Sequence, residues 1–367
     1  MKPLEILVPR WTDSQNRNPQ NLNASAMLAR FRRPEARWTA FYYHTPVEDV
    51  GQSEQVRLVK LWQTRAWKAD VVRQYQKTVD AIFYPGVGRE DELGWGFRKL
   101  SGRRVPLIAT MESLVGDDRR EALFAEIAGH PVHCARVPDR TLRWLDSLYK
   151  DAELIIAISP LLAKLGSGLY GQKFRVQMLG VDSVFSPSSR QPKTRPRVIN
   201  VASFQERKRP QLFFDLAMRF PQADFTWYGD GGRLGELREL AQARGLKNLS
   251  FPGGAQHHEL PKIMRDADIF VLPSNSEGVP KVTQEAAACG LPVVVFGFYE
   301  APSVLHKQNG YVVWTDDEMF GAVELLLSDE AIRAEMGRRG AAMAAEWNWN
   351  ERAPAWERDI LEFLLKN

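Results

Sequence analysis

Short apolar runs alternate with longer amphipathic stretches along the whole chain of 367 residues. Continuous apolar runs of strand length, separated by helical stretches, are typical of parallel sheets that are covered by helices on both faces. The runs predicted to be strands are residues 4–8, 38–43, 81–84, 105–110, 154–159 and 174–179, followed by 198–201, 224–228, 249–251, 269–272, 292–296 and 311–314. Two such series predict an α/β fold of two doubly wound, Rossmann-like domains.

A segment without aliphatic or aromatic side chains separates the two series. Residues 186–197 are rich in proline, serine and basic residues, which is the composition of a linker stiffened by proline. We therefore expect a first domain over residues 1–185 and a second domain over residues 198–348. Residues 349–367 are predicted to form a final amphipathic helix. Its apolar face would contain Ala353, Trp356, Ile360, Phe363 and Leu364.

Composition narrows the class of protein. Apolar residues make up 44% of the chain and charged residues 26%, which is the profile of a soluble globular protein. No run is long enough to span a membrane, and the first residues lack the apolar run of a signal peptide, so we expect a cytoplasmic location. Cys134 and Cys289 fit neither a zinc site nor a disulfide framework. Residues 1–185 contain 27 Lys and Arg against 21 Asp and Glu, an excess that fits an anionic partner or an ordinary solvated surface.

The junction after the run at residues 269–272 is the richest in polar chemistry. A loop containing Glu277 and Gly278 leads into a helix predicted to begin at Pro280 or Lys281, and Glu285 follows within that helix. Free amides and the positive end of the helix dipole at such a start favour phosphate, and glycine allows a close approach to the backbone. The two carboxylates would suit hydroxyl groups of a sugar and of a ribose, although an acidic residue there is often only a cap or a dipole partner.

A basic cluster follows the first strand of the second domain. Arg207, Lys208 and Arg209 stand in a strand-to-helix loop, where they would neutralise a diphosphate or form a solvated turn. The dinucleotide fingerprint G-x-G-x-x-G is absent, because the glycine cluster at residues 229–235 misses that spacing. An NAD-dependent oxidoreductase is therefore disfavoured.

An ordered set of motifs extends this hypothesis. The motifs are Tyr228-Gly229-Asp230-Gly231, Phe251-Pro252-Gly253, the run from Ala267 to Ser274, Glu277-Gly278, and the run from Glu285 to Val294. Together they resemble family 4 of the retaining glycosyltransferases, including that family's two glutamates separated by seven residues. The likeness covers about residues 150–320. It implies a GT-B fold, in which two Rossmann-like domains face a central cleft and the C-terminal helix crosses back to the first domain.

The resemblance also assigns roles to residues. Glu285 would hold the ribose, Glu277 the transferred sugar, and Lys208 the diphosphate. Segment 251–255, with Gly253, would lie beside the base. The amides of the segment Val279, Pro280, Lys281, Val282 and Thr283 would receive the diphosphate, and Gly278 would allow the donor to approach the backbone.

Several positions depart from the family pattern. An arginine is usual about five residues before the lysine, where this chain has Ala202-Ser203, so Arg207 or Arg209 would have to supply the charge. Glu112 stands near a position where many members have a histidine, and it would either take over a catalytic contact with the sugar or have no role. Asn21 and Asn23 lie in a segment that replaces a glycine-rich loop and either bind the acceptor or belong to a surface loop. Glu300 falls about three residues before the family's next glutamate.

The predicted reaction is transfer of a sugar from a nucleoside-diphosphate sugar to a glycan, a lipid-linked acceptor or another hydroxyl acceptor, with retention of configuration. It belongs to bacterial polysaccharide or glycoconjugate synthesis. Glu277, Lys208 and Glu112 are the candidate catalytic residues. The diphosphate loop carries no Asp-x-Asp motif, so we expect no metal and no other cofactor. The alternatives are a sugar-nucleotide epimerase or hydrolase, and a non-catalytic module that binds sugar nucleotides or glycans; nothing indicates nucleic acid.

A further segment bears on the location of the acceptor. Residues 56–78 read as a basic amphipathic helix. Such a helix would either contact an anionic membrane at its inner face or pack against its own sheet.

Overall fold

The computed structural model of the chain describes residues 2–12, 19–51, 53–61, 67–86, 98, 102–188 and 194–366. The chain divides into two compact units. The first comprises Met1–Arg119, Arg136–Gly180 and Trp349–Asn367, and the second comprises Arg120–Ala135 and Val181–Asn348. The expected linker, residues 186–197, thus belongs to the second unit, and its residues 189–193 lie outside the described residues. The final segment belongs to the first unit.

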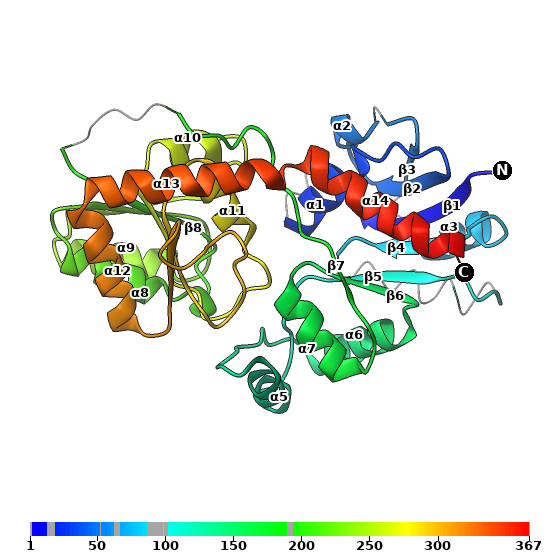
Figure 1. Cartoon of the computed structure of the whole chain (residues 1–367), viewed down its shortest axis with the longest axis horizontal. Helices are drawn as coiled ribbons and strands as arrows, with labels where there is room; N and C mark the ends of the chain where they lie inside the picture. Colours follow the sequence, from blue (N-terminus) through cyan, green and yellow to red (C-terminus); the bar gives the residue numbers. More distant parts are fainter. Residues whose placement is uncertain are drawn as a thin grey trace. The chain divides into compact units, whose positions relative to one another are not determined.

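The first unit is built on a parallel sheet of seven strands in the order β3-β2-β1-β4-β5-β6-β7 (Figure 1). Its elements are β1 (Leu4–Trp11), α1 (Pro19–Leu28), β2 (Ala36–Tyr42), α2 (Glu48–Gly51), β3 (Val56–Lys60), α3 (Trp67–Tyr75), β4 (Ala81–Tyr84), β5 (Leu107–Met111), α6 (Asp139–Asp151), β6 (Leu154–Ala157), α7 (Pro160–Tyr170), β7 (Arg175–Val176) and α14 (Trp349–Lys366). Helix α5 (Asp118–Ala128) begins in this unit and continues into the second. Strand β4 pairs with β1 on the side opposite to β2, so the order of the strands reverses between β1 and β4.

The second unit repeats this plan with six parallel strands in the order β10-β9-β8-β11-β12-β13. Its elements are β8 (Arg197–Val201), the short 3₁₀ helix η2 (Glu206–Lys208), α8 (Pro210–Arg219), β9 (Asp224–Tyr228), α9 (Leu234–Ala243), β10 (Leu249–Gly253), α10 (Leu260–Arg265), β11 (Ile269–Leu272), α11 (Lys281–Ala288), β12 (Val293–Phe296), β13 (Gly310–Val313), α12 (Asp316–Ser328), α13 (Glu330–Ala344) and the 3₁₀ helix η3 (Ala345–Trp347). The order of the strands reverses between β8 and β11. The two doubly wound sheets expected from the sequence are confirmed.

Helix α14 packs on the first unit through the face that the sequence predicted. Ala353, Trp356 and Ile360 are fully buried, whereas Phe363 and Leu364 are only partly covered. The carboxylate of Glu357, on the same helix, accepts hydrogen bonds from the backbone amides of Arg32 and Arg33. A buried acid thus satisfies two donors at the end of the turn that follows α1.

One predicted element is wrong. Residues 56–60 form strand β3 at the edge of the first sheet and not the start of a basic helix, and the helix α3 begins only at Trp67. Residues 62–66, within the predicted helix, lie outside the described residues. In the described part of the chain, no helix combines the length and the hydropathy that a membrane span requires.

Candidate donor site

The loops at the carboxyl ends of β8 and β11 meet in the second unit. In open α/β sheets the point where the strand order reverses leaves a crevice beyond the carboxyl ends of the two strands. The loop after β8 carries Arg207 and Lys208, and the loop after β11 carries Glu277. The backbone amide of Asn275 donates to the carbonyl oxygen of Arg207 over 2.8 Å, which joins the two loops directly.

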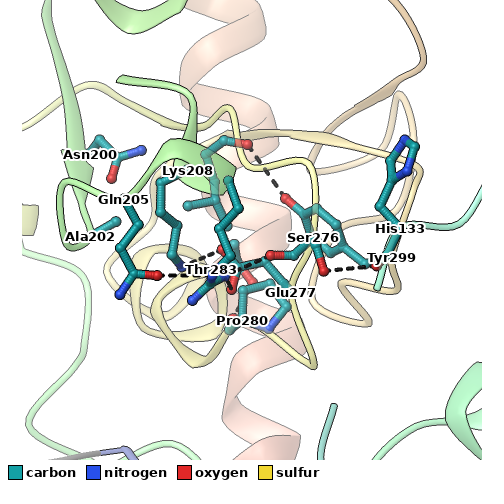
Figure 2. A network of polar contacts seen from close by, with 12 residues as sticks. His133, Asn200, Ala202, Gln205, Lys208, Ser276, Glu277, Pro280, Thr283 and Tyr299 are labelled. Atoms are coloured by element: carbon teal, nitrogen blue, oxygen red, sulfur yellow. Dashed lines mark hydrogen bonds and ion pairs between the residues drawn. The ribbon is translucent and has the colours of Figure 1, made fainter. Parts of the chain in front are cut away.

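Two cations of the first loop converge on one carboxylate of the second. The ammonium of Lys208 forms an ion pair with Oε1 of Glu277 (Figure 2). The guanidinium of Arg207 lies 3.2 Å from Oε2 of the same carboxylate. The side chains of Lys208 and Glu277 are 12% and 9% exposed, whereas that of Arg207 is 38% exposed. The site therefore contains two positive charges and one negative charge, an excess suited to an anionic ligand.

Burial changes the titration of two groups beside Glu277. The pKa of the Lys208 ammonium is lowered mainly by burial; the Glu277 carboxylate acts to raise it, and Arg207 lowers it further. The pKa of the Tyr299 phenol is raised well above its usual range, chiefly by burial and also by Glu277. Tyr299 therefore keeps its proton, and its hydroxyl points to the carbonyl oxygen of Leu272 over 3.5 Å.

Ser276 fixes the loop that carries Glu277 from two sides. Its carbonyl oxygen accepts a hydrogen bond of 2.7 Å from Arg207, and its hydroxyl donates to the carbonyl oxygen of His133 over 2.8 Å (Figure 2). His133 belongs to the segment Arg120–Ala135, which is part of the second unit although it comes from the first half of the chain. The His133 ring also packs edge-on against Phe298, with ring centres 4.9 Å apart.

The segment Arg120–Ala135 is held in its conformation by an internal acid. The carboxylate of Glu121 accepts hydrogen bonds from the backbone amide of Cys134 at 2.8 Å and lies 3.0 Å from Nδ1 of His133. A second ring contact joins His130 to Trp314, with centres 5.1 Å apart. The anchor of Ser276 is therefore itself fixed by polar and aromatic contacts.

Helix α11 begins directly after this loop and has an uncapped amino end. Pro280 is the N-cap residue, and its side chain cannot accept a hydrogen bond from the first amides of the helix. The hydroxyl of Thr283 is turned away from them, since it donates to the carbonyl oxygen of Pro280 and contacts the hydroxyl of Ser303 over 2.8 Å. The start of α11 has the positive end of the helix dipole and no side-chain cap, so it is suited to a ligand such as phosphate.

Glu285 lies on α11 and is 4% exposed. The Nε2 atom of His257 lies 3.4 Å from Oε1 of Glu285. The His257 ring packs edge-on against Phe185. Lys281, at the start of the same helix, is also buried, so its side chain points inward.

The loop after β10 is shaped by glycines. Gly253 has a φ of +102°, a conformation that side chains rarely adopt. A Cβ on Gly254 would lie 2.1 Å from Oδ2 of Asp230, and the amide of Gly254 donates to Oδ1 of the same carboxylate over 3.1 Å. Asp230 therefore holds this loop against the turn that follows β9.

The remaining predicted site residues lie elsewhere. Arg209 has a φ of +50°, and its guanidinium pairs with Asp316 and lies over the ring of Phe296 at 5.1 Å, so it does not join Arg207 at Glu277. Glu112 follows β5 in the first unit and is partly exposed. Asn21 and Asn23 lie in α1 of the same unit and are buried, not exposed in a surface loop.

Four residues of the site were not predicted from the sequence as parts of it. They are His133, His257, Ser276 and Tyr299. Ser276 is the only one that a local signal indicated, because it stands next to Glu277 in a loop already assigned to the ligand. Among the described residues, no group of three or more His, Cys, Asp or Glu side chains converges as a metal site would require.

Solved structures define the class of fold. The structure of HepE from Anabaena, in complex with UDP and glucose, matches with a TM-score of 0.75 at 18% identity, over 99% of this chain and 100% of that one. Sucrose-phosphate synthase from Thermosynechococcus elongatus matches with a TM-score of 0.74 over the full length of both chains. The fold is therefore the GT-B fold, as the resemblance implied.

The sequence comparisons point to the same class of protein. Residues 183–343 match the family described as "Glycosyl transferases group 1". The GDP-mannose-dependent alpha-(1-6)-phosphatidylinositol monomannoside mannosyltransferase of Mycolicibacterium smegmatis is 33% identical over 174 residues, which are 43% of this chain and 46% of that protein. The D-inositol 3-phosphate glycosyltransferase of an Arthrobacter species is 29% identical over 286 residues, 68% of this chain and 63% of the relative. The chain thus spans less than half the length of the mycobacterial relative.

Proposed function

We propose that the chain is a retaining glycosyltransferase that moves a sugar from a nucleoside-diphosphate sugar to a hydroxyl acceptor in the synthesis of a bacterial glycoconjugate. One observation carries the proposal. Arg207 and Lys208 converge on Glu277 at the loop that leads into the uncapped start of α11, with Glu285 farther along that helix. The same short region therefore offers cations, the amino end of a helix and two carboxylates, which are the groups that a sugar nucleotide requires.

Each group has a role in binding the donor. The diphosphate lies against Arg207, Lys208 and the backbone from Gly278 to Thr283. Glu285 accepts hydrogen bonds from ribose hydroxyls, and Glu277 accepts them from hydroxyls of the transferred sugar. The loop at Gly253 lies beside the base. The names of the relatives support such a donor, since one is GDP-mannose-dependent and HepE was solved with UDP and glucose.

The reaction breaks the bond between the anomeric carbon and the diphosphate oxygen and forms a bond from the same carbon to the acceptor oxygen. The electron pair of the broken bond stays on the diphosphate, and Lys208, Arg207 and the amides of α11 stabilise this charge. The acceptor attacks the face from which the diphosphate leaves, and its proton passes to the departing diphosphate. The configuration at the anomeric carbon is thereby retained.

We expect the transfer to need no metal ion. Two cationic side chains and a helix amino end already supply positive charge where the diphosphate develops its negative charge. Glu112 is the candidate for an additional contact with the sugar, and Asn21 and Asn23 are the candidates for the acceptor. Transfer rates measured with excess EDTA and with excess magnesium test whether the reaction needs a metal ion.

The acceptor is a hydroxyl group of a glycan or of a lipid-linked glycan. The mycobacterial relative is named for a phosphatidylinositol mannoside acceptor. A lipid-linked acceptor requires the protein to reach a membrane surface. Flotation with phosphatidylglycerol-containing vesicles and with pure phosphatidylcholine vesicles distinguishes a lipid-linked acceptor from a free glycan. An enzyme directed to a membrane would float with the anionic vesicles and not with the neutral ones.

Donor binding is tested first by thermal denaturation with UDP, GDP, ADP, CMP and dTDP. A ligand at 100 times its dissociation constant stabilises the folded state by roughly 2.7 kcal/mol, which gives a clear rise in Tm. We expect one diphosphate to raise the Tm without magnesium and to lose this effect in Glu285→Gln. Glu236→Gln, at an exposed glutamate paired with Arg233, is the matched control and should keep the effect.

Transfer is tested with sugar donors of the base so identified. Release of the nucleoside diphosphate that depends on an added glycan acceptor, with a product of the same anomeric configuration by NMR, would support the proposal. Release without any acceptor would instead indicate an epimerase or a hydrolase. Binding without turnover, with every acceptor supplied, would indicate a non-catalytic sugar-nucleotide module.

A further inference from the structure

A separate cleft of about 700 Å³ lies at the open edge of the second sheet. Its walls are strand β13, the loop before it and one face of α12. The lining includes His306, Lys307, Tyr311, Trp314, Glu318 and Gly321. None of these residues belongs to the proposed donor site.

Half of the outward backbone groups of β13 are already hydrogen-bonded at this edge. The strand pairs with β12 on one side, so the N–H and C=O groups of residues 310, 312 and 314 face the cleft. Three of these six groups are bonded within the chain: Gly310 O accepts from the amide of Lys307 at 2.8 Å, the amide of Val312 donates to Nδ1 of His306 at 3.2 Å, and the amide of Trp314 donates to Oε2 of Glu318 at 2.7 Å. A peptide strand that added to this edge would therefore lack part of the usual ladder of hydrogen bonds. The cleft is suited to a compact ligand instead.

An aromatic ring forms part of its wall. The Trp314 side chain is 40% exposed, which is unusual for an indole. One part of the ring lies against Gly297, where an added Cβ would approach it to 2.5 Å, and its edges meet Phe298 and His130. The ring is thus held in place by its covered part while the rest remains open to a ligand.

Hydrogen-bond donors and hydrogen-bond acceptors both lie around the Trp314 ring. Because Nδ1 of His306 accepts the amide hydrogen of Val312, the proton of the neutral imidazole is on Nε2, which makes that atom a donor. Glu318 uses Oε2 for the amide of Trp314, and its other oxygen is an acceptor. Lys307 has a φ of +63°, a conformation that is uncommon away from glycine and that concentrates at binding sites.

Packing within the chain does not require a glycine at position 321. It lies in the interior of α12, where glycine is less favourable than alanine. A Cβ at this position would meet no atom within 4 Å, so no packing contact requires its absence. What the missing side chain does is leave the wall of the cleft open.

We propose that this cleft binds a saccharide unit, at a site distinct from the donor site. A sugar ring offers an apolar face to an exposed indole, and its hydroxyls both donate and accept, which matches Trp314, Glu318 and His306. A strongly anionic ligand would face the carboxylate of Glu318, and a cationic ligand would face Lys307. Gly321 lets the ring lie close to the backbone of α12. This assignment does not depend on the transferase activity.

The test is saturation-transfer NMR of maltose, lactose and α-1,6-mannobiose with the full chain. We expect at least one of them to bind and to remain bound when a saturating nucleoside diphosphate is added. Gly321→Leu should weaken that binding at least tenfold while leaving the Tm unchanged or higher, because leucine fills the cleft and favours the helix. Gly235→Leu, at a glycine of α9 whose Cβ also meets no atom, is the control and should bind as the wild type does.

Trp314→Ala provides a second variant and should also abolish the binding. The proposal is overturned if none of the three sugars binds, if the nucleoside diphosphate displaces the bound sugar, or if Gly321→Leu binds it as tightly as the wild type. Displacement would show that the sugar occupies the donor site. Loss of nucleotide binding in Gly321→Leu would equally contradict a separate site.

Discussion

The hydroxyl of Ser276 donates a hydrogen bond of 2.8 Å to the carbonyl oxygen of His133, a residue 143 positions earlier in the chain. Ser276 is 4% exposed and precedes Glu277 directly. Its carbonyl oxygen is held at the same time by Arg207. The peptide that orients Glu277 is therefore fixed between a cation of the site and a segment from the first half of the chain.

Removing the Ser276 hydroxyl should loosen this loop. A typical hydrogen bond stabilises a protein by about 0.5–1.5 kcal/mol, so Ser276→Ala should lower the unfolding free energy by about 1 kcal/mol. We also expect a lower kcat for transfer with a smaller change in the affinity for the nucleoside diphosphate, because the loop orients Glu277 and the sugar. Urea denaturation and steady-state rates measure the two effects.

Two other serine variants complete that experiment. Ser276→Thr keeps a hydroxyl and should recover most of the lost kcat. Ser328→Ala removes an exposed hydroxyl that bonds Leu325 O at the end of α12, and it should change neither quantity. A Ser276→Ala enzyme with unaltered kcat would show that the bond to His133 does not position Glu277.

Arg207 and Arg209 should differ sharply despite standing two positions apart. Arg207 points to Glu277, whereas Arg209 pairs with Asp316 and lies over Phe296. Charge-assisted hydrogen bonds contribute roughly 1.5–3 kcal/mol, so Arg207→Ala should weaken binding of the nucleoside diphosphate about tenfold or more. Arg209→Ala should change that affinity less than about threefold, because the Arg209 guanidinium is held at Asp316 and does not lie at Glu277.

Isothermal titration calorimetry measures the affinity of each variant for the nucleoside diphosphate and shows which arginine contacts it. Equal losses of affinity would mean that Arg209 leaves Asp316 when the ligand binds. A larger loss in Arg209→Ala than in Arg207→Ala would reverse the assignment of the diphosphate contact.

The sequence predicted most of the fold because most strands are buried on both faces. Strands β4, β9 and β11 were predicted to the residue. Strands β4 and β11 are continuous apolar runs that are buried throughout, and β9 alternates buried Phe225 and Trp227 with partly exposed residues. Strand β3 is the exception. It lies at the sheet edge, and its mixture of Val56, Leu58 and Val59 with exposed Arg57 and Lys60 has the appearance of an amphipathic helix.

The site was predictable only where its residues are close in sequence. Glu277 and Glu285 share one loop and helix, and their spacing within an ordered motif set was informative. The sequence did not indicate whether Arg207 or Arg209 lies at Glu277. That choice depends on the left-handed φ of +50° at Arg209, which turns its side chain toward Asp316. Similarly, nothing local connects His133 with Ser276, since that contact depends on how a segment of the first half packs.

Affinity for the nucleoside diphosphate should depend on the titration of Lys208. Burial lowers the pKa of this ammonium below the usual 10.5, and the charged form is the one that attracts phosphate. As pH rises through the lowered pKa the ammonium loses its proton, so affinity should fall about tenfold per pH unit in an alkaline range that begins below 10.5. Lys208→Arg keeps its charge throughout, and its affinity should not fall in that range. Calorimetric titrations from pH 7 to 10 would reveal the difference, and parallel curves for the two proteins would exclude Lys208 as the titrating group.

Glu357 should make the first unit less stable as pH rises, whereas a salt-bridged acid makes a protein less stable as pH falls. The pKa of this carboxyl is raised above 4.5, mainly by burial, although the amides of Arg32 and Arg33 act to lower it. Between 4.5 and the raised value the folded state binds more protons than the unfolded state, so the stabilisation is fully present at the acidic end and is lost as pH rises through this window.

The glutamine of Glu357→Gln cannot ionise, so the Tm of this variant should not show the fall that Glu357 causes as pH rises. The amide retains one acceptor for the two backbone N–H groups, and the variant should be less stable than the wild type by about 1–2 kcal/mol at acidic pH. The deficit should shrink as pH rises through the window, because only the wild type then carries a buried charge. Calorimetric scans from pH 4 to 7 measure the difference in Tm, with Glu362→Gln on the exposed face of α14 as the control. A deficit that stayed constant across this range would mean that Glu357 has the same pKa in the folded and unfolded chain.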